Sequence, residues 1–442
     1  MSTTTIYLIF IFSLFIPPHP ATADQSFISL LITQNGLDFV KDLLISEAIS
    51  LLTPLWLTKI ERTIKIPVVG KVHIALSDIT VNRVNIGSSY IKPSVTGVSI
   101  DGSEVTCELN MKWHYSYGTW LAPISISDGG TASVQVNGAG VGLTLGLDNQ
   151  EGSLKLSTIE SIEKAITEKL KTGVSKLGSF LQALPKRIPV DDIAALNVTF
   201  VNDPFLSDDS LGFEINGLFI ESKKDTLSRR KALLPPVSCS DSSKMVGIAL
   251  DEAVFVSAAA LYYNAMFMHW VVDKVPEQSL LNTAGWRFIV PQLYRKYPNA
   301  DMNLDISLSD PPVVQILWQN IDATVYADLI IDVLEGDETI PVAFEVIGNN
   351  LAGHLRLDDF TMSLKWSKIG TLHMFLVQPV MWTLIETVFM PYVNAQLGNG
   401  FPLPIIHGFT LQNAEIVSTD SRITVCSDVT YQESFDRSSY AS

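Results

Sequence analysis

Apolar residues alternate with small or polar residues over positions 141–156, which is typical of a strand with one buried face. Turn-forming residues interrupt the alternation at 148–152 and indicate a β-hairpin. The spacing then changes to that of one face of a helix over 158–184, with Ser157 and Glu160 at capping-box spacing. The pattern predicts a one-sided hairpin followed by a long amphipathic helix. The apolar hairpin positions are Val141, Leu143, Leu145, Leu147, Leu154 and Leu156.

The rest of the chain repeats this combination of strands and helices. In the first half, residues 29–52 carry a helical stripe from Leu37 to Leu52 and precede strand-like runs at 64–86, 94–100, 105–113 and 132–136. In the second half, a strand and a helix share residues 245–266, and a second long apolar helix covers 377–397. We therefore expect an α+β fold of two similar barrel-like domains, each a twisted antiparallel sheet wrapped on a long helix. The other predicted strands of the second half are 300–308, 313–318, 323–332, 342–347 and 354–366.

Two segments differ in composition from these domains. An apolar run at 6–16, followed by prolines and by small residues up to Ala23, predicts a signal peptide (1–23) and a secreted protein. Residues 221–244 are charged, rich in serine and contain Pro235-Pro236, which is typical of a connector. The predicted domains are therefore 24–220 and 245–442.

Composition and charge narrow the range of partners. The chain is 47% hydrophobic and 17% charged, yet beyond the N-terminus no apolar run is long enough to predict a membrane span. The net charge is −16; residues 24–190 are balanced, with 15 basic and 15 acidic side chains, whereas 191–442 hold 15 basic and 31 acidic ones. We expect no nucleic acid partner.

The sequence contains no recognisable catalytic or metal-binding motif. We therefore predict no enzyme, no metal and no cofactor. Among the three cysteines, Cys107, Cys239 and Cys426, one internal pair and three free thiols remain equal alternatives. Asn197-Val198-Thr199 is a glycosylation sequon, provided that Asn197 is exposed.

The aromatic cluster KWHYSYGTW, residues 112–120, has two interpretations. Its aromatic rings can pack across strands in the core. Alternatively, they form an amphipathic loop for a membrane or micelle interface or a lipid headgroup, with Lys112 and His114 adding positive charge.

Several segments together resemble one known family. They are ITQNGLDFVKDLL, IKIPVVGKVHI, MVGIALDEAVFVSAAALYY, YRKYPNADMNLDISLSDPPVV and VNAQLGNGFPLPIIHGFTLQNAEI. This family comprises the bactericidal permeability-increasing (BPI) and lipopolysaccharide-binding (LBP) proteins and the phospholipid and cholesteryl ester transfer proteins. The resemblance is closest to its plant branch. It implies a boomerang of two barrels joined by a central sheet, each with an apolar pocket for acyl chains between helix and sheet.

The chain departs from the family pattern in two respects. A strand with a cysteine and the start of the long helix are missing near 157–161, as in a shortened isoform, so neither partner of the family's disulfide is present. The first half is neutral, whereas the antibacterial members of the family carry a basic tip. On this basis we place headgroup contacts at the tip and acyl contacts in the pocket. The tip residues are Lys65, Lys71, Lys92, Lys112, Trp113 and Trp120, and the pocket residues are Leu37, Val40, Leu44, Ile166 and Leu170.

The resulting hypothesis is a secreted protein of innate immunity that binds lipopolysaccharide or related bacterial lipids. The alternative is a transfer protein for endogenous phospholipids without a microbial role.

Overall fold

The computed structural model describes most of the chain. The described residues are 26–66, 70–94, 97–118, 125–161, 164–222, 237, 239, 241, 243–272, 281–318, 320–330, 334–347, 349–365, 367 and 370–432. The predicted signal peptide and most of the predicted connector lie outside them. The described chain forms two compact units. The N-terminal unit holds residues 32–184 and 203–212, and the C-terminal unit holds 26–31, 185–202 and 213–432.

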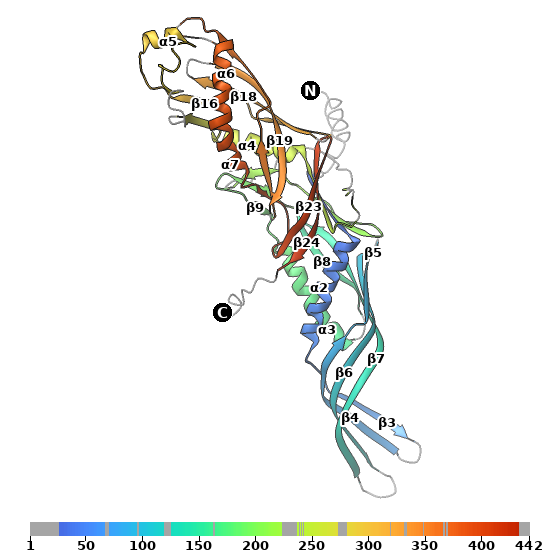
Figure 1. Ribbon diagram of the computed structural model, residues 1–442. Coiled ribbons are helices and arrows are strands. Elements are labelled where there is room, and N and C mark those ends of the chain that lie inside the picture. The colour runs from blue at the N-terminus through green and yellow to red at the C-terminus, as the bar shows by residue number, and fades with distance from the viewer. Residues whose placement is uncertain are drawn as a thin grey trace, which may run out of the picture. The chain divides into compact units, whose positions relative to one another are not determined.

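The N-terminal unit consists of one antiparallel sheet and two helices (Figure 1). The sheet has the strand order β2-β4-β6-β7-β8, with β3 paired to β4 and β5 paired to β6. The helices are α2 (Gln34–Leu52) and α3 (Lys164–Gln182). The strands are β2 (Leu55–Leu57), β3 (Ile60–Ile66), β4 (Gly70–Asn85), β5 (Ser88–Ser94), β6 (Gly97–Gly118), β7 (Ser125–Gln150) and β8 (Ser153–Ser161).

Two strands of this sheet are much longer than the sequence pattern indicates. β6 has 22 residues and β7 has 26, so the predicted runs 105–113, 132–136 and 141–147 are parts of longer strands. The predicted run 94–100 combines the last residue of β5 with the first residues of β6. The predicted hairpin is confirmed, with Leu147 opposite Leu156. The predicted capping box is wrong, because Ser157 and Glu160 pair with β7 as part of β8 and the helix begins at Lys164.

Among the described residues, the C-terminal unit holds two complete sheets, most of a third sheet and three helical segments (Figure 1). The helices are α4 (Glu252–Asn264), α5 (Pro291–Lys296) and the continuous α6 (Met374–Leu384), η2 (Ile385–Phe389) and α7 (Met390–Leu397). A three-stranded sheet has the order β13-β10-β9, and an eight-stranded sheet has the order β15-β16-β18-β19-β20-β22, with β17 on β18 and β21 on β19. Their strands are β9 (Arg187–Pro189), β10 (Ala194–Asn197), β13 (Phe219–Glu221), β15 (His269–Val272), β16 (Leu304–Leu308), β17 (Val313–Leu317), β18 (Asn320–Ile330), β19 (Leu334–Ile347), β20 (Asn350–Leu355), β21 (Asp359–Leu364) and β22 (Phe401–Pro402).

A further six-stranded sheet joins distant parts of the sequence. Its order is β11-β12-β1-β14-β24-β23, and Ile28, Ile248 and Val425 on its inner strands are fully buried. The sequence placed 185–202 and 213–220 in the first domain, but both belong with the C-terminal unit. β12 pairs with β1, which in turn pairs with β14, and 187–197 form the small sheet β13-β10-β9 together with β13. The strands of the six-stranded sheet are β1 (Ile28–Thr33), β11 (Phe205–Leu206), β12 (Ser210–Ile215), β14 (Val246–Asp251), β23 (Phe409–Thr419) and β24 (Arg422–Tyr431).

The helical stretch Met374–Leu397 is long and apolar enough to cross a membrane, judged by length and composition. It also contributes Val377, Met381, Leu384 and Met390 to a buried core cluster. A core helix explains its composition equally well, so this stretch carries no argument for a membrane span.

Candidate functional site

One face of β6 is apolar along almost its whole length. Strand alternation, adjusted for the bulges near Val105, assigns ten positions to this face, and nine of them are apolar. The neighbouring positions on the other face, such as Ser99, Glu108 and Lys112, are polar. The ten positions are Val98, Ile100, Gly102, Val105, Cys107, Leu109, Met111, Trp113, Tyr115 and Tyr117.

Cross-strand pairing extends this apolar face over the neighbouring strands. Directly opposed residues of antiparallel strands lie on the same face, so each register pair adds a member. Tyr117 is opposite Val72 and Ile126, and Val72 is opposite Ile64. The outer part of the face, here called the outer apolar face, consists of Ile60, Ile64, Ile66, Val72, Ile74, Leu76, Met111, Trp113, Tyr115, Tyr117 and Ile126.

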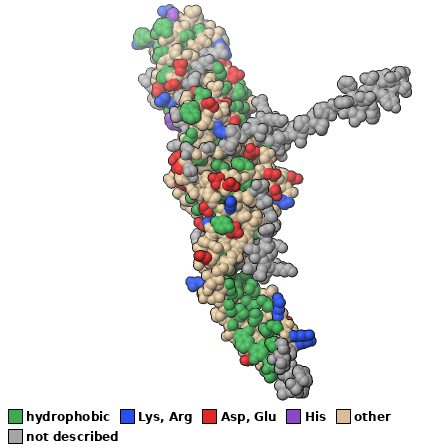
Figure 2. Space-filling model, turned by 90° about the vertical axis from the view of Figure 1, so that its right-hand side faces the viewer, with side chains coloured by type: hydrophobic (Ala, Val, Ile, Leu, Met, Phe, Trp, Pro, Cys, Tyr) green, Lys and Arg blue, Asp and Glu red, His purple; other side chains and the backbone are tan. Residues whose placement is uncertain are grey.

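The apolar face is buried at one end of the sheet and accessible at the other. Near the helices, Val98, Val105 and Leu145 are buried. At the outer end, Ile64 and Ile66 are 47% and 43% exposed. Figure 1 shows that α2 and α3 lie along the inner part of the sheet, whereas β3 and the outer ends of β4, β6 and β7 extend beyond them. Figure 2 shows hydrophobic side chains gathered over this outer part, with Lys and Arg side chains along one border.

Three aromatic rings line the outer apolar face along β6. The rings of Trp113 and Tyr115 are stacked with centroids 5.9 Å apart, and those of Tyr115 and Tyr117 with centroids 6.3 Å apart. All three residues are half-buried. Such a row offers a flat, rigid apolar surface with polar ring atoms at its edge, which suits the boundary between acyl chains and headgroups.

The opposite face of the same strands is polar and carries the basic residues. Lys65 is directly opposite Lys71, and His73 pairs in register with Ser116. Lys112 forms an exposed ion pair with Asp78, with 2.9 Å between Nζ and Oδ2. The hydrogen bond from Lys112 to Asp78, together with the negative charge of that carboxylate, raises the pKa of Lys112. Among the described residues of the sheet, Arg62, opposite Ile74, is the one Lys or Arg that the register places on the apolar face.

The comparisons with known proteins agree on one family. A family model described as "LBP / BPI / CETP family, C-terminal domain" matches residues 189–431. A BPI/LBP family protein of Arabidopsis thaliana is 52% identical to this chain, and the alignment covers 96% of each. The chain belongs to the LBP/BPI/CETP family.

More distant members of the family show how far the likeness extends. A bactericidal permeability-increasing protein of Sebastes schlegelii is 22% identical over 90% of this chain and 94% of its own length. A crystal structure of lipopolysaccharide binding protein matches with a TM-score of 0.60 and 19% identity, over 93% of this chain and 100% of that one. This match confirms the predicted α+β fold.

The length of the Arabidopsis alignment bears on the predicted missing segment. It spans 468 positions, more than the 442 residues of this chain, so some positions of that family member have no counterpart here. Their location is not given by the alignment length, and the assignment to 157–161 remains a prediction.

The structure separates the residues predicted for a lipid-binding tip. Trp113 lies on the outer apolar face, whereas Lys65, Lys71 and Lys112 lie on the polar face. Lys92 pairs with Ser99, 13 residues along β6 from Lys112, which corresponds to about 40 Å. Trp120 lies outside the described residues. The isoleucines of β3 were not among the predicted site residues, although the alternation in IERTIKI marks them.

The structure describes the side chains of three of the five residues predicted for an apolar pocket. Leu37 on α2 is buried, and Val40 and Leu44 are half-buried. The side chains of Ile166 and Leu170 on α3 lie outside the described residues. The predicted pocket residues whose side chains are described therefore all lie on α2.

Polar contacts hold α2 against the edge strand β5. Gln34 Nε2 donates to the Ile91 carbonyl at 3.2 Å, and Lys41 Nζ donates to the Ser89 carbonyl at 3.3 Å. Burial disfavours the charge of Lys41, but hydrogen bonds to Asp42 and Asp38 outweigh it and raise the pKa of Lys41. The helix is thus fixed at the sheet edge by its polar side.

Asn197 does not meet the condition on which its predicted glycosylation depended. It is 7% exposed, and its Oδ1 accepts hydrogen bonds from the Thr199 amide and hydroxyl. A glycan on this side chain would have to displace the buried end of β10, the central strand of its sheet, which argues against modification of the folded protein.

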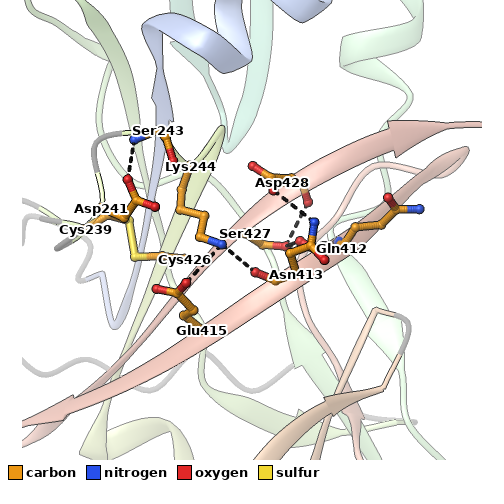
Figure 3. A network of polar contacts seen from close by, with 10 residues as sticks. All are labelled: Cys239, Asp241, Ser243, Lys244, Gln412, Asn413, Glu415, Cys426, Ser427 and Asp428. Carbon is orange, nitrogen blue, oxygen red and sulfur yellow. Dashed lines mark hydrogen bonds and ion pairs between the residues drawn. A yellow bond between two sulfur atoms is a disulfide. The ribbon is translucent and has the colours of Figure 1, made fainter.

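The cysteines form one disulfide, between Cys239 and Cys426 on β24, with Cα atoms 5.9 Å apart (Figure 3). Cys107 is free and half-buried on the apolar face of β6. The bridge ties the C-terminal part of the predicted connector to β24. No group of three or more His, Cys, Asp or Glu able to hold a metal ion occurs among the described residues.

Proposed function

We propose that this protein binds lipids through the N-terminal sheet, with acyl chains on the apolar face and the headgroup near its outer end. The observation that carries the proposal is the long apolar face of β6, which runs from buried residues beside the helices to half-buried residues beyond them. Transfer of acyl carbons from water onto such a face contributes about 0.8 kcal/mol per CH₂. From Val98 to Tyr117 the face extends about 60 Å, long enough for extended chains.

We further propose that the ligand is lipopolysaccharide or a related bacterial lipid, bound by a secreted protein in immune defence. The fold and family of a lipopolysaccharide binding protein support the ligand class. The apolar N-terminal run and a disulfide, which persists in oxidising compartments, support secretion. In a secretion assay, the mature protein is expected to begin at Asp24.

Arg62 is our proposed contact for a lipid phosphate. It is exposed and shares the apolar face with the aromatic row, and a guanidinium can bind a phosphate through two parallel hydrogen bonds. Lys65 and Lys71, on the polar face at the same end, would add a salt-sensitive attraction. Lys112 would add less, because Asp78 already balances its charge.

The alternative is a carrier of endogenous phospholipids. It is favoured by the balanced charge of residues 24–190 and by Asp128, which the register with Tyr115 places on the apolar face. A carrier needs an open apolar surface without a strongly basic rim. Displacement of a bound fluorescent acyl probe separates the two functions: lipopolysaccharide should compete at lower concentration than phosphatidylcholine if the first is right.

A matched pair of variants tests the apolar face itself. Ile64→Asp puts a charge on the outer apolar face, and Thr63→Asp puts the same charge on the polar face of the same exposed strand. Uptake of the acyl probe should fall about tenfold in the first variant and stay unchanged in the second. Equal uptake by both variants, or no uptake by the parent protein, would rule out this face as the lipid site.

A second pair tests the phosphate contact. Arg62→Gln should weaken binding of lipopolysaccharide several-fold while leaving uptake of a neutral acyl probe intact. Arg83→Gln removes a charge from the polar face, where Arg83 is opposite Glu108, and serves as the control. Equal weakening of both ligands by Arg62→Gln would contradict the phosphate role.

A further inference from the structure

Exposed aromatic and basic side chains gather on residues 281–300 and on the first turn of α6. Phe288 and Phe375 are 77% and 71% exposed, although phenylalanine is usually buried in folded proteins. Figure 1 shows α5 and the beginning of α6 at the same end of the C-terminal unit. The group, here called the basic–aromatic surface, consists of Arg287, Phe288, Arg295, Lys296, Tyr297 and Phe375.

The backbone that presents these side chains is firmly anchored. Trp286, Val290 and Leu293 are buried in the same core cluster as Val377 of α6. Thr283 Oγ1 donates to the Tyr297 carbonyl at 2.6 Å and accepts from the Ala300 amide at 2.9 Å, which closes the segment on itself. The exposed rings therefore occur on an ordered scaffold and do not result from poor local packing.

The charge of this surface is opposite to that of its surroundings. Residues 281–300 contain three basic side chains and no acidic one, within a half of the chain whose balance is −16. Within the described part of the chain, no ion pair joins Arg287, Arg295 or Lys296 to a carboxylate. The Arg287 guanidinium lies 4.4 Å from the ring centroid of Phe288, and Lys296 Nζ lies 5.4 Å from that of Tyr297. Cations and rings are thus paired on one surface.

We propose that the basic–aromatic surface docks the C-terminal unit onto an anionic phospholipid membrane. Aromatic rings prefer the headgroup level of a bilayer, and neighbouring Lys and Arg side chains are attracted by its anionic lipids. The −16 balance of the half does not prevent this, because charges more than about 8 Å away are largely screened at physiological ionic strength. This activity goes beyond the proposed lipid binding, since it requires no acyl chain on the N-terminal sheet.

Vesicle binding of the full chain tests the role of the cations. The vesicles contain either phosphatidylcholine alone or equal parts of phosphatidylcholine and phosphatidylglycerol. The parent protein should sediment with the anionic vesicles and lose this binding at high salt. A combined Arg287→Glu, Arg295→Glu and Lys296→Glu variant should bind them at least about tenfold more weakly. Arg356→Glu, an exposed cation of the same unit outside the surface, should bind as the parent does.

A second pair of variants tests the rings. Phe288→Ala combined with Phe375→Ala should weaken vesicle binding several-fold at constant salt, whereas Trp318→Ala, an equally exposed aromatic of the same unit, should not. Circular dichroism confirms that each variant is folded. The proposal is overturned if the parent protein binds both vesicle types equally, or if the charge-reversed variant binds anionic vesicles as tightly as the parent does. It is also overturned if the surface binds another protein but no vesicles.

The same variants distinguish this inference from the proposed function. Uptake of the acyl probe should be unchanged in all of them, because the N-terminal apolar face is intact. Probe uptake without anionic vesicle binding would overturn only the membrane docking. Vesicle binding that depends on Arg287 and Phe288, without probe uptake, would overturn only the lipid site.

Discussion

Lys244 is a buried cation whose contacts hold an irregular part of β23 (Figure 3). Its Nζ donates to the Asn413 carbonyl at 2.8 Å and pairs with Glu415 at 3.1 Å, where the register of β23 shifts between Gln412 and Glu415. The Ser427 hydroxyl on β24 completes the arrangement by donating to the Gln412 carbonyl. Removal of this buried charge is costly, because the Asn413 carbonyl would lose its hydrogen bond and the Glu415 carboxylate its ion pair.

Replacement of Lys244 by Met should therefore lower the free energy of unfolding by about 1–3 kcal/mol, measured by urea denaturation. The control is Arg356→Met, which removes an exposed ion pair with Asp358 and should change stability by less than about 0.5 kcal/mol. Similar unfolding midpoints for the two variants would show that Lys244 contributes no more than a surface charge.

Tyr262 gives a pH-dependent contribution at the residue scale. Burial of its ring and its 2.6 Å hydrogen bond to Asp191 raise the pKa of Tyr262 well above the ordinary value of about 10. The other oxygen of Asp191 accepts the amides of Ile193 and Ala194, so the phenol is bound to a fixed carboxylate. Because the folded-state pKa is raised, the stabilisation is complete below about pH 10 and is lost as the pH rises through the folded pKa.

The parent protein should exceed Tyr262→Phe in stability by about 1 kcal/mol at pH 8. This difference should shrink between about pH 10 and pH 11, because the phenol of Tyr262 ionises there in the unfolded parent but not in the folded parent. The variant lacks this phenol. Urea denaturation of both proteins at pH 8 and pH 11 measures the change. A difference that stays constant over this range would contradict the raised pKa.

At the scale of the element, β6 shows what the sequence could predict. Its alternation from Leu109 to Tyr117 identifies a strand and its apolar face. Its full length could not be predicted, because Glu104 adopts a positive φ of 54° and a bulge restores the alternation beyond it. Such a bulge is favourable only when neighbouring strands hold it. The prediction that Lys112 and Trp113 contact the same lipid headgroup treated the cluster as a loop. In a strand, these neighbouring side chains lie on opposite faces of the sheet.

The first residue of β6 is a glycine that its surroundings require. Gly97 has a φ of 144°, and a Cβ there would lie 2.2 Å from the Leu145 carbonyl oxygen of β7. Gly97→Ala should therefore lower the melting temperature by several degrees, with an unfolding free energy reduced by about 2 kcal/mol or more. Gly140→Ala in β7 is the control, because its Cβ would meet nothing closer than 3.9 Å. A similar melting temperature for both variants would contradict this steric argument.

On the scale of the whole molecule, the C-terminal unit is assembled from three separate parts of the sequence. Residues 26–31, 185–202 and 213–432 contribute to it, and the composition of 221–244 alone suggested a simple division there. The strands β1 and β12 are short and apolar, like many others, so the pattern does not reveal their partners. Only tertiary pairing assigns them to the sheet of β14 and β24.

The disulfide between Cys239 and Cys426 links positions 187 residues apart. A cross-link over so long a loop restricts the unfolded chain, so Cys239→Ser should lower the free energy of unfolding by about 2–4 kcal/mol. Cys107→Ser, which changes a free thiol, is the control and should have a smaller effect. Reducing agent should destabilise the parent protein to the same extent as Cys239→Ser and leave that variant unchanged. A parent protein insensitive to reduction would contradict this prediction.

The position of β1 between β12 and β14 has a consequence for the order of events during synthesis. β1 leaves the ribosome among the first described residues, but β12 and β14 follow only after residue 210, and β24 completes the sheet near residue 431. Residues 32–184 can fold in the meantime. The six residues of β1 stay exposed until β12 and β14, the strands they pair with, have been synthesised. Nascent chains stalled before residue 246 should therefore bind chaperones through this segment, and release should follow the emergence of β24.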